Sequence, residues 1–228
     1  MKRSVKKGNK GEEIVTNVLN KQKDDYFLIN NLILLGENNI SHQFDHILIR
    51  HNGIFVIETK NYYGEISGNI EDTYWKKTYY LKGKVKVDSF MNPLKQNNAH
   101  IRYLKKIIGK NYPLYNFVVF VNNDVSKLNI YNVTNEHNLL GRIINISKDN
   151  VISLEKMKEI NNYLLYMEAD IQDSDHLNNI KEMKKNRKEK IKIEEIAIEK
   201  EICPMCGFDI KRNKNVYLCP RCGYKLVV

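Results

Sequence analysis

Long apolar runs are missing from this 228-residue sequence, and no stretch approaches the roughly 18 apolar residues that a membrane-spanning helix needs. The basic start, MKRSVKKGNK, is not followed by the apolar segment of a secretory signal peptide, so we expect neither a signal peptide nor a contact with the membrane. These absences predict a cytoplasmic protein, whose cysteines stay reduced or bind metal instead of forming disulfides.

Acidic residues are outnumbered, since 37 Lys and Arg against 27 Asp and Glu give a formal charge of +10 and a pI near 9.2. This excess favours an anionic partner, with nucleic acid as the first candidate, although many basic proteins bind nothing anionic. Hydrophobic residues make up 42% of the chain, which excludes wholesale disorder. The length allows one ordinary domain and a small appendage.

Cysteine occurs four times, in two Cys-x-x-Cys pairs that are each followed by glycine: Cys203, Cys206, Cys219 and Cys222. A gap of two residues lets both sulfurs of a pair bind one ion, and four thiolates suit tetrahedral Zn²⁺. With four protein ligands the site is closed, so we expect a structural zinc ribbon over residues 202–228. Its lysines and arginines are compatible with phosphate contacts; a role in protein contact or stability is the alternative.

Proline and glycine are absent from residues 170–201, where charges of both signs alternate. This composition predicts a charged helical linker or flexible tether over residues 169–201. Apolar periodicity before it predicts an α/β domain over residues 1–168. The expected helices are 11–21, 92–108 and 151–167, and the expected strands are 26–35, 43–50, 54–60 and 115–121, with 127–133 and 141–147 as weaker strand candidates.

The segment FDHILIRHNGIFVIETK, residues 44–60, combines two apolar strands with two acids and a lysine. Its Asn-Gly pair at 52–53 is a strong signal for a two-residue type I′ turn. With that turn, Asp45 lies opposite Lys60, two residues beyond Glu58. Opposite residues share a face, and alternation keeps i and i+2 together, so the three charges cluster. A register slip of one residue would scatter them.

Two carboxylates beside an ammonium group suit Mg²⁺-assisted phosphodiester cleavage. Mg²⁺ takes one or two carboxylates and completes its octahedron with water and substrate oxygens. We expect Asp45 and Glu58 to supply these carboxylates and the Thr59 carbonyl to be a further ligand. Lys60 would orient or help to deprotonate the attacking water, or stabilise developing charge, with a pKa that falls if the lysine is desolvated. The alternative is a hairpin in which the acids simply neutralise Lys60.

The wider set of residues resembles the PD-(D/E)xK restriction-endonuclease-like nucleases, and it is similar to the nuclease-related (NERD) domain of that superfamily over about residues 8–122. Phe44 replaces the proline that usually precedes the aspartate. The matching residues, in chain order, are Lys10-Gly11-Glu12, Gln43-Phe44-Asp45-His46, Asn52 to Asn61, Gly64, Trp75, Asn92-Pro93-Leu94-Lys95-Gln96 and His100.

The resemblance implies an α/β restriction-endonuclease-like core, a mixed central sheet flanked by helices, followed by a topoisomerase-type zinc ribbon. It implies that Asp45 and Glu58 bind the metal and that Lys60 is the catalytic lysine. Glu12, in preference to Glu13, would help to hold a water or a second ion, and Gln96 would bond a water on the metal or a phosphate.

The function expected from this resemblance is Mg²⁺- or Mn²⁺-dependent hydrolysis of DNA, with the zinc ribbon assisting nucleic-acid binding. Cutting both strands of a duplex would call for two such sites, so a homodimer or a DNA-processing protein partner is a further expectation. The alternative is a non-cleaving DNA-binding or protein-docking module built on a nuclease-like scaffold.

Aromatic residues alternate with lysines over residues 62–84. Aromatic rings next to cations can stack on bases and contact phosphate, but such residues more often pack between strands. For Trp75 we expect core packing.

Overall fold

The computed structural model describes residues 3–35, 41–146, 149–168, 201, 203, 210–213, 216–218 and 225–227. The chain divides into two compact units, Met1–Asp170 and Ile171–Val228. The linker expected at 169–201 lies outside the described residues except for Glu201, as does most of the expected zinc ribbon. In the described residues, no helix has the length and apolar character needed to cross a membrane.

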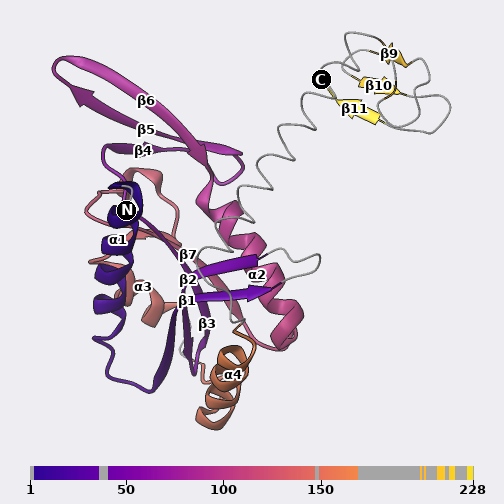
Figure 1. Ribbon diagram of the computed structural model, residues 1–228. Coiled ribbons are helices and arrows are strands. Elements are labelled where there is room, and N and C mark those ends of the chain that lie inside the picture. Colours follow the sequence, from indigo (N-terminus) through magenta and orange to yellow (C-terminus); the bar gives the residue numbers. More distant parts are fainter. Residues whose placement is uncertain are drawn as a thin grey trace. The chain divides into compact units, whose positions relative to one another are not determined.

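A five-stranded mixed sheet forms the centre of the first unit, in the order β1-β2-β3-β7-β8 (Figure 1). Strands β1, β2 and β3 pair with one another in antiparallel fashion, whereas the β3–β7 and β7–β8 pairs are parallel. The β3–β7 pair is reached through a long crossover that includes α2, as parallel strands require. The strands are β1 (Tyr26–Leu35), β2 (Ser41–Arg50), β3 (Gly53–Lys60), β7 (Leu114–Phe120) and β8 (Val133–Asn135).

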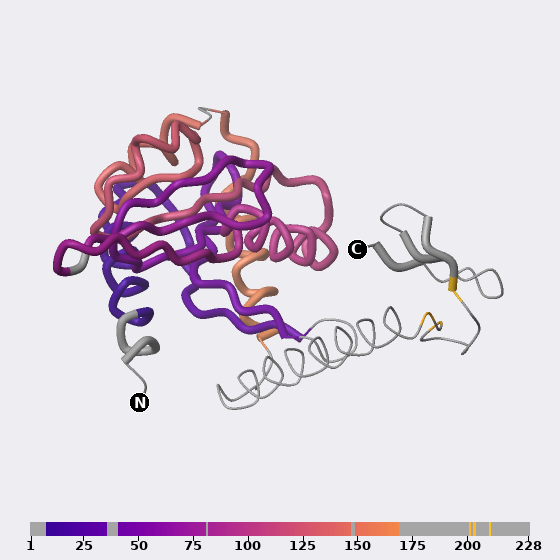
Figure 2. Tube along the Cα trace, turned by 90° about the horizontal axis from the view of Figure 1, so that it is seen from above, coloured from indigo at the N-terminus to yellow at the C-terminus, as the bar shows by residue number. Residues whose placement is uncertain are grey.

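Helices cover both faces of this sheet (Figures 1 and 2). One core cluster joins α1 and α3 to Leu48, Phe55 and Ile57, and another joins α2 and α4 to the alternate residues of the same strands. This three-layer arrangement confirms the expected mixed sheet flanked by helices. The helices are α1 (Arg3–Leu19), α2 (Pro93–Ile108), α3 (Leu139–Asn145) and α4 (Leu154–Tyr166).

A second, three-stranded sheet is inserted between β3 and α2, in the order β4-β5-β6. Its strands are β4 (Glu65–Ser67), β5 (Tyr74–Leu81) and β6 (Lys84–Met91). Trp75 is fully buried at its base and stacks on Phe120, so the expected packing role of Trp75 is confirmed. A short 3-10 helix, η2 (Ser126–Leu128), follows β7.

Within its described residues, the second unit has three short antiparallel strands in the order β11-β10-β9: β9 (Lys211–Asn213), β10 (Val216–Leu218) and β11 (Lys225–Val227). The Ile210 amide donates to the Glu201 carbonyl at 2.8 Å, and Cys203 is buried.

The hairpin register differs from the prediction. Arg50 pairs with Gly53, so residues 51–52 form the loop, in place of 52–53. Gly53 is needed in the strand instead: at its φ of 144°, a Cβ would lie 2.5 Å from the Tyr115 ring. Each β2 residue therefore pairs with a β3 residue two positions earlier than predicted. A shift of two residues leaves every side chain on its predicted face of the sheet.

The weak strand candidate at 141–147 is also wrong, because residues 139–145 form α3. Leu139 and Ile143 are four residues apart and are both fully buried against the α1 side of the sheet. That spacing places both on one helical face, and the further apolar residues Leu140, Ile144 and Ile146 hid it in the sequence.

Candidate active site

The charged residues of the hairpin meet the first turn of α2 at the end of β3. Lys60 Nζ donates to Glu58 Oε1 and, at 3.3 Å, to Gln96 Oε1. Gln96 Nε2 donates to the same Glu58 oxygen at 2.8 Å. Glu58 is buried, with 4% of its surface exposed, and Lys60 is partly buried. The three side chains therefore form one closed hydrogen-bonded group.

Asp45 joins this group from β2. The paired residues of β2 and β3 end at His46 and Ile57, and Asp45 Oδ2 then accepts the Thr59 amide hydrogen at 2.8 Å. The carboxylate thus takes the place of the next backbone carbonyl in the ladder. Continuing the register puts Asp45 opposite Glu58, and residues opposite each other lie close together on one face.

Glu12 approaches from α1, on the other side of the sheet. A Cβ on Gly11 would lie 2.8 Å from Asn61 Cβ, so the glycine allows α1 to come close to the chain that leaves β3. Glu12 is partly buried there, whereas Glu13 is exposed. Burial and the charge of Glu58 raise the pKa of Glu12, against a hydrogen bond from Asn31 and the charge of Lys60.

Asn31 is a residue of this site that the sequence analysis missed. It interrupts β1 with a positive φ of 55°, and its side chain bonds Glu12. A residue in the left-handed region inside a strand is uncommon and often marks a functional site, and asparagine tolerates that conformation best after glycine. The available signal was the polar pair at 30–31 inside the apolar segment YFLINNLILL.

The electrostatics of the cluster favour a cation. Burial, followed by the charge of Glu58, raises the pKa of Asp45 well above its usual range, despite the Thr59 amide and Lys60. Burial alone would lower the pKa of Lys60, but attraction to Glu58, Tyr62 and Asp45 outweighs it and raises that pKa. The expected fall in the pKa of Lys60 is therefore wrong, and the lysine stays charged.

Three carboxylates face one ammonium group here, which leaves an excess of negative charge. Within the described residues, no three His, Cys, Asp or Glu side chains converge closely enough to hold an ion by themselves. A metal at Asp45 and Glu58 would thus need oxygens from the backbone, water or substrate. That requirement suits Mg²⁺, which takes few protein carboxylates and keeps several waters.

His46 lies on the opposite face of β2 and takes no part in this cluster. Its Nδ1 is 2.8 Å from Asn30 Oδ1 and its Nε2 is 3.0 Å from Thr59 Oγ1. Burial lowers the pKa of His46 to about 4, so the ring is neutral. Because Asn30 Oδ1 only accepts, Nδ1 carries the proton and Nε2 accepts from the Thr59 hydroxyl.

This buried histidine predicts acid sensitivity of the metal-free protein. Between pH 6.5 and 4 the unfolded chain binds a proton at His46 that the folded protein does not, so stability falls as the pH falls. The loss attributable to His46 is about 3 kcal/mol over this window. Urea unfolding in EDTA across the window should show a shallower pH dependence for His46→Gln than for wild type. If the free energy of unfolding depended on pH equally in the two proteins, the lowered pKa of His46 would be contradicted.

Two asparagines fix the helix that carries Gln96. Asn92 caps α2 by accepting from Leu94 N at 2.9 Å, and its Nδ2 donates to the carbonyls of Ile70 and Asp72 at 3.0 and 2.8 Å. Asn97 Nδ2 donates to the Val56 carbonyl at 2.8 Å. Gln96 lies between these two anchors, so its direction is set by the attachment of the helix to the sheet and the preceding loop.

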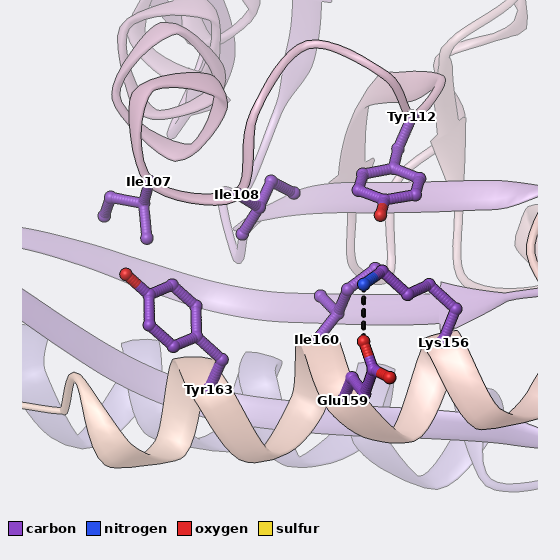
Figure 3. A pocket seen from close by; sticks show the side chains of 7 residues that line it. All are labelled: Ile107, Ile108, Tyr112, Lys156, Glu159, Ile160 and Tyr163. Atoms are coloured by element: carbon purple, nitrogen blue, oxygen red, sulfur yellow. Dashed lines mark hydrogen bonds and ion pairs between the residues drawn. The ribbon is translucent and has the colours of Figure 1, made fainter.

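An apolar pocket of about 290 Å³ lies away from this cluster (Figure 3). The end of α2 and one face of α4 form it, and Lys156 pairs with Glu159 at its wall. Gln96 lies in the first turn of α2, about 16 Å along the helix from Ile107 at 1.5 Å per residue. The pocket therefore contributes nothing to the acidic cluster.

The expected zinc site is only partly described. Cys203 is buried, with 2% of its surface exposed. Cys206, Cys219 and Cys222 lie outside the described residues, so the zinc ribbon stays a prediction.

Comparison with known proteins finds a family match over the part of the chain that holds the acidic cluster. The model of the nuclease-related domain family, NERD, matches residues 7–121, a span that contains all five expected catalytic residues. An uncharacterized protein of Bacillus anthracis is 34% identical over 115 residues, which are 50% of this chain and 52% of the relative. The chain thus spans about half the length of the curated relative it matches. No solved structure matches the chain.

Proposed function

The chain belongs to the nuclease-related domain family, and we propose that it is a metal-dependent nuclease that hydrolyses DNA phosphodiester bonds. The supporting observation is the convergence of Asp45, Glu58 and Lys60 with Gln96 in one partly buried cluster. Buried charges are expensive, and a purely structural hairpin would be more stable with apolar residues at these positions. Retention of the whole set favours chemistry.

Asp45 and Glu58 would hold the metal, with the Thr59 carbonyl as a third ligand. The Thr59 amide points toward Asp45, and the carbonyl of a strand residue points to the same side as its amide. When bound, Mg²⁺ or Mn²⁺ supplies Lewis-acid polarisation of the phosphate and makes water a better nucleophile. A divalent cation would also balance the excess negative charge of the cluster.

Lys60 stabilises charge in this proposal and is not the base. Its ammonium stays protonated because Glu58 and Asp45 surround it. From its place between Glu58 and Gln96 it would donate to a non-bridging phosphate oxygen, where negative charge increases in the transition state. Gln96 holds Lys60 and Glu58 in position by accepting from one and donating to the other.

Glu12 would hold the attacking water. Its carboxylate is partly exposed, lies close enough to Glu58 and Lys60 to feel their charges, and is fixed by Asn31. A carboxyl whose pKa is raised by burial accepts a proton more readily at neutral pH than an ordinary glutamate does. This placement suits a group that takes the proton of the water as it attacks.

The direct test is cleavage of labelled single-stranded, duplex and branched DNA by zinc-loaded protein. We expect products with Mg²⁺ or Mn²⁺ and none with EDTA, because the acids repel the phosphate when no cation is present. Restoring Mg²⁺ in excess over EDTA should restore cleavage. Equal product with and without EDTA would contradict a metal-dependent mechanism.

One observation favours the non-cleaving alternative: Lys60, Glu58 and Gln96 satisfy one another without any ligand. A DNA-binding or protein-docking module could keep such a group as a scaffold. In that case DNA affinity would depend on salt but not on Mg²⁺, would survive Asp45→Ala, and no substrate would be cut.

The role of the second unit follows from the cysteine spacing. Four thiolates in two Cys-x-x-Cys pairs suit Zn²⁺, and the nearby lysines and arginines suit phosphate. We therefore assign the segment 202–228 an assisting role in nucleic-acid binding. A nuclease acting on both strands of a duplex would do so as a homodimer or with a DNA-processing partner.

A further inference from the structure

Strands β5 and β6 form a two-stranded ribbon that extends away from the central sheet (Figure 1). They pair without interruption from Tyr74–Met91 to Leu81–Lys84, and the turn residues Lys82 and Gly83 both have positive φ, as a type I′ turn requires. Strand β4 pairs only with residues 76–78. In the described part of the chain, the outer half of the ribbon has no other strand beside it.

The base of the ribbon is fixed and its outer half is not buried. Trp75 is fully buried, and its Nε1 donates to the Asn69 carbonyl at 2.8 Å. Farther out, Tyr80, Val85 and Val87 have 67%, 60% and 53% of their surfaces exposed. A two-stranded ribbon gains little stability by itself, and grouped exposed apolar side chains mark interaction sites. A partner that covers the outer half explains both features.

The charge of the ribbon identifies the kind of partner. Residues 74–91 contain five lysines and one acid, Asp88, which pairs with Lys77 at 3.7 Å and Lys86 at 3.5 Å. Lys82 and Lys84 are exposed and form no ion pair within the residues that the structure describes. Two copies of such a ribbon would repel each other, whereas a polyanion would be attracted.

The ribbon also borders the catalytic cluster. Lys77 Nζ lies 4.8 Å from the centre of the Tyr62 ring, and Tyr62 follows Lys60 by two residues. The same ring packs edge-on against Phe90 at the base of β6, with 4.9 Å between centroids. A polymer with one phosphate at Lys60 would therefore pass Lys77 at the base of the ribbon, and phosphates farther along it could reach the lysines of the outer half.

We propose that the β5–β6 ribbon is a DNA-binding arm, in which Lys82, Lys84 and Lys86 bind backbone phosphates that flank the phosphate held at Lys60. A two-stranded ribbon is narrow enough to enter the major groove of a duplex. There the lysines reach the phosphates, and Tyr80 and Val85, on the opposite face from Lys84 and Lys86, reach sugars and base edges. This assignment rests on the proposed nuclease function and adds the surface that positions its substrate.

The test measures DNA binding without cleavage. Full-length protein carrying Asp45→Asn is titrated into labelled duplex DNA in EDTA, at several salt concentrations, by fluorescence anisotropy. Adding Lys82→Ala, Lys84→Ala and Lys86→Ala should weaken binding about 10- to 100-fold at low salt and reduce the slope of log K against log salt by about 2 to 3. These lysines are exposed, so the variant should unfold in urea like its parent.

A matched variant controls for net charge. Lys105→Ala, Lys110→Ala and Lys158→Ala remove three exposed lysines from other parts of the first unit. This control should lose less than about threefold in affinity and keep the parent slope. Equal losses of DNA affinity in the two triple variants would contradict the proposal that the ribbon is a DNA-binding arm. So would a ribbon variant that binds DNA normally but no longer binds vesicles of phosphatidylglycerol, because the arm would then recognise an anionic membrane.

The outcomes separate this inference from the proposed function. Ribbon-dependent binding by a protein that never cleaves DNA with Mg²⁺ would support the arm and contradict the nuclease. Metal-dependent cleavage with binding and KM unchanged in the ribbon variant would contradict the arm and support the nuclease.

Discussion

Replacing Lys60 with methionine is expected to lower the rate of DNA cleavage about a thousandfold, because in the proposed mechanism this lysine stabilises the negative charge that develops on the phosphate. Methionine keeps the length and apolar stem of lysine but cannot donate a hydrogen bond to Glu58 or Gln96. Asp45→Asn should cost a similar factor, since the amide oxygen can still accept from Thr59 N while the ligand charge is lost. Single-turnover cleavage at saturating Mg²⁺ measures both.

Lys127→Ala is the matched control for Lys60. Lys127 also pairs with a glutamate, Glu65, at 2.9 Å, but 77% of its side chain is exposed and the pair lies outside the cluster. Its removal should change the rate less than about twofold, because exposed ion pairs contribute little. Wild-type rates for Lys60→Met and Asp45→Asn would place any cleavage activity elsewhere in the chain.

Metal binding gives the same variants a readout that does not depend on turnover. A cation that binds only the folded protein stabilises it by about 2.7 kcal/mol at a hundredfold excess over its Kd. Wild type should therefore unfold at a higher temperature with Mg²⁺ than with EDTA. Asp45→Asn should lose most of this difference, whereas Lys127→Ala should keep it.

The sequence was most informative where periodicity alone decides a contact. Asp45, Glu58 and Lys60 share a face because side chains alternate along a strand, and a register error of two residues left that result intact. Val118, Val119 and Phe120 form a strand buried on both faces, as their continuous apolar run indicates. Both results depend only on the order of residues along one or two neighbouring strands. They could therefore be predicted without knowing which helices pack against the sheet.

Contacts that depend on tertiary approach were less accessible. Gly53 has the sequence environment of a turn residue, but the Tyr115 ring makes it necessary inside β3. Asn31 bonds Glu12 only because α1 packs against one face of the sheet. Glu12 itself was found through its resemblance to a family motif, since an acid in the first turn of the helix expected at 11–21 would have had an ordinary explanation. That expected start was wrong: α1 begins at Arg3, so Glu12 lies in the interior of the helix.

The asparagine at the start of α2 leads to the second large effect. Asn92→Ala should destabilise the protein by about 2 to 3 kcal/mol: about 1 kcal/mol from the lost helix cap and the rest from partly buried carbonyls that lose their donor. Asn92 is fully buried, and its Nδ2 donates to the carbonyls of Ile70 and Asp72. Urea unfolding measures the loss. Because Gln96 lies in the same first turn, cleavage should also slow under native conditions.

Ser153→Ala tests whether Asn92 is more than a cap. Ser153 caps α4 through a single 3.3 Å bond from Lys156 N at an exposed position, so its loss should cost about 0.5 to 1 kcal/mol. Asn92→Ser, which can still cap α2 but cannot donate to the two carbonyls at once, should fall between the alanine variant and wild type. Equal losses for Asn92→Ala and Ser153→Ala would show that the carbonyl contacts contribute nothing, and Gln96 would then owe its position to Asn97 and the packing of α2 alone.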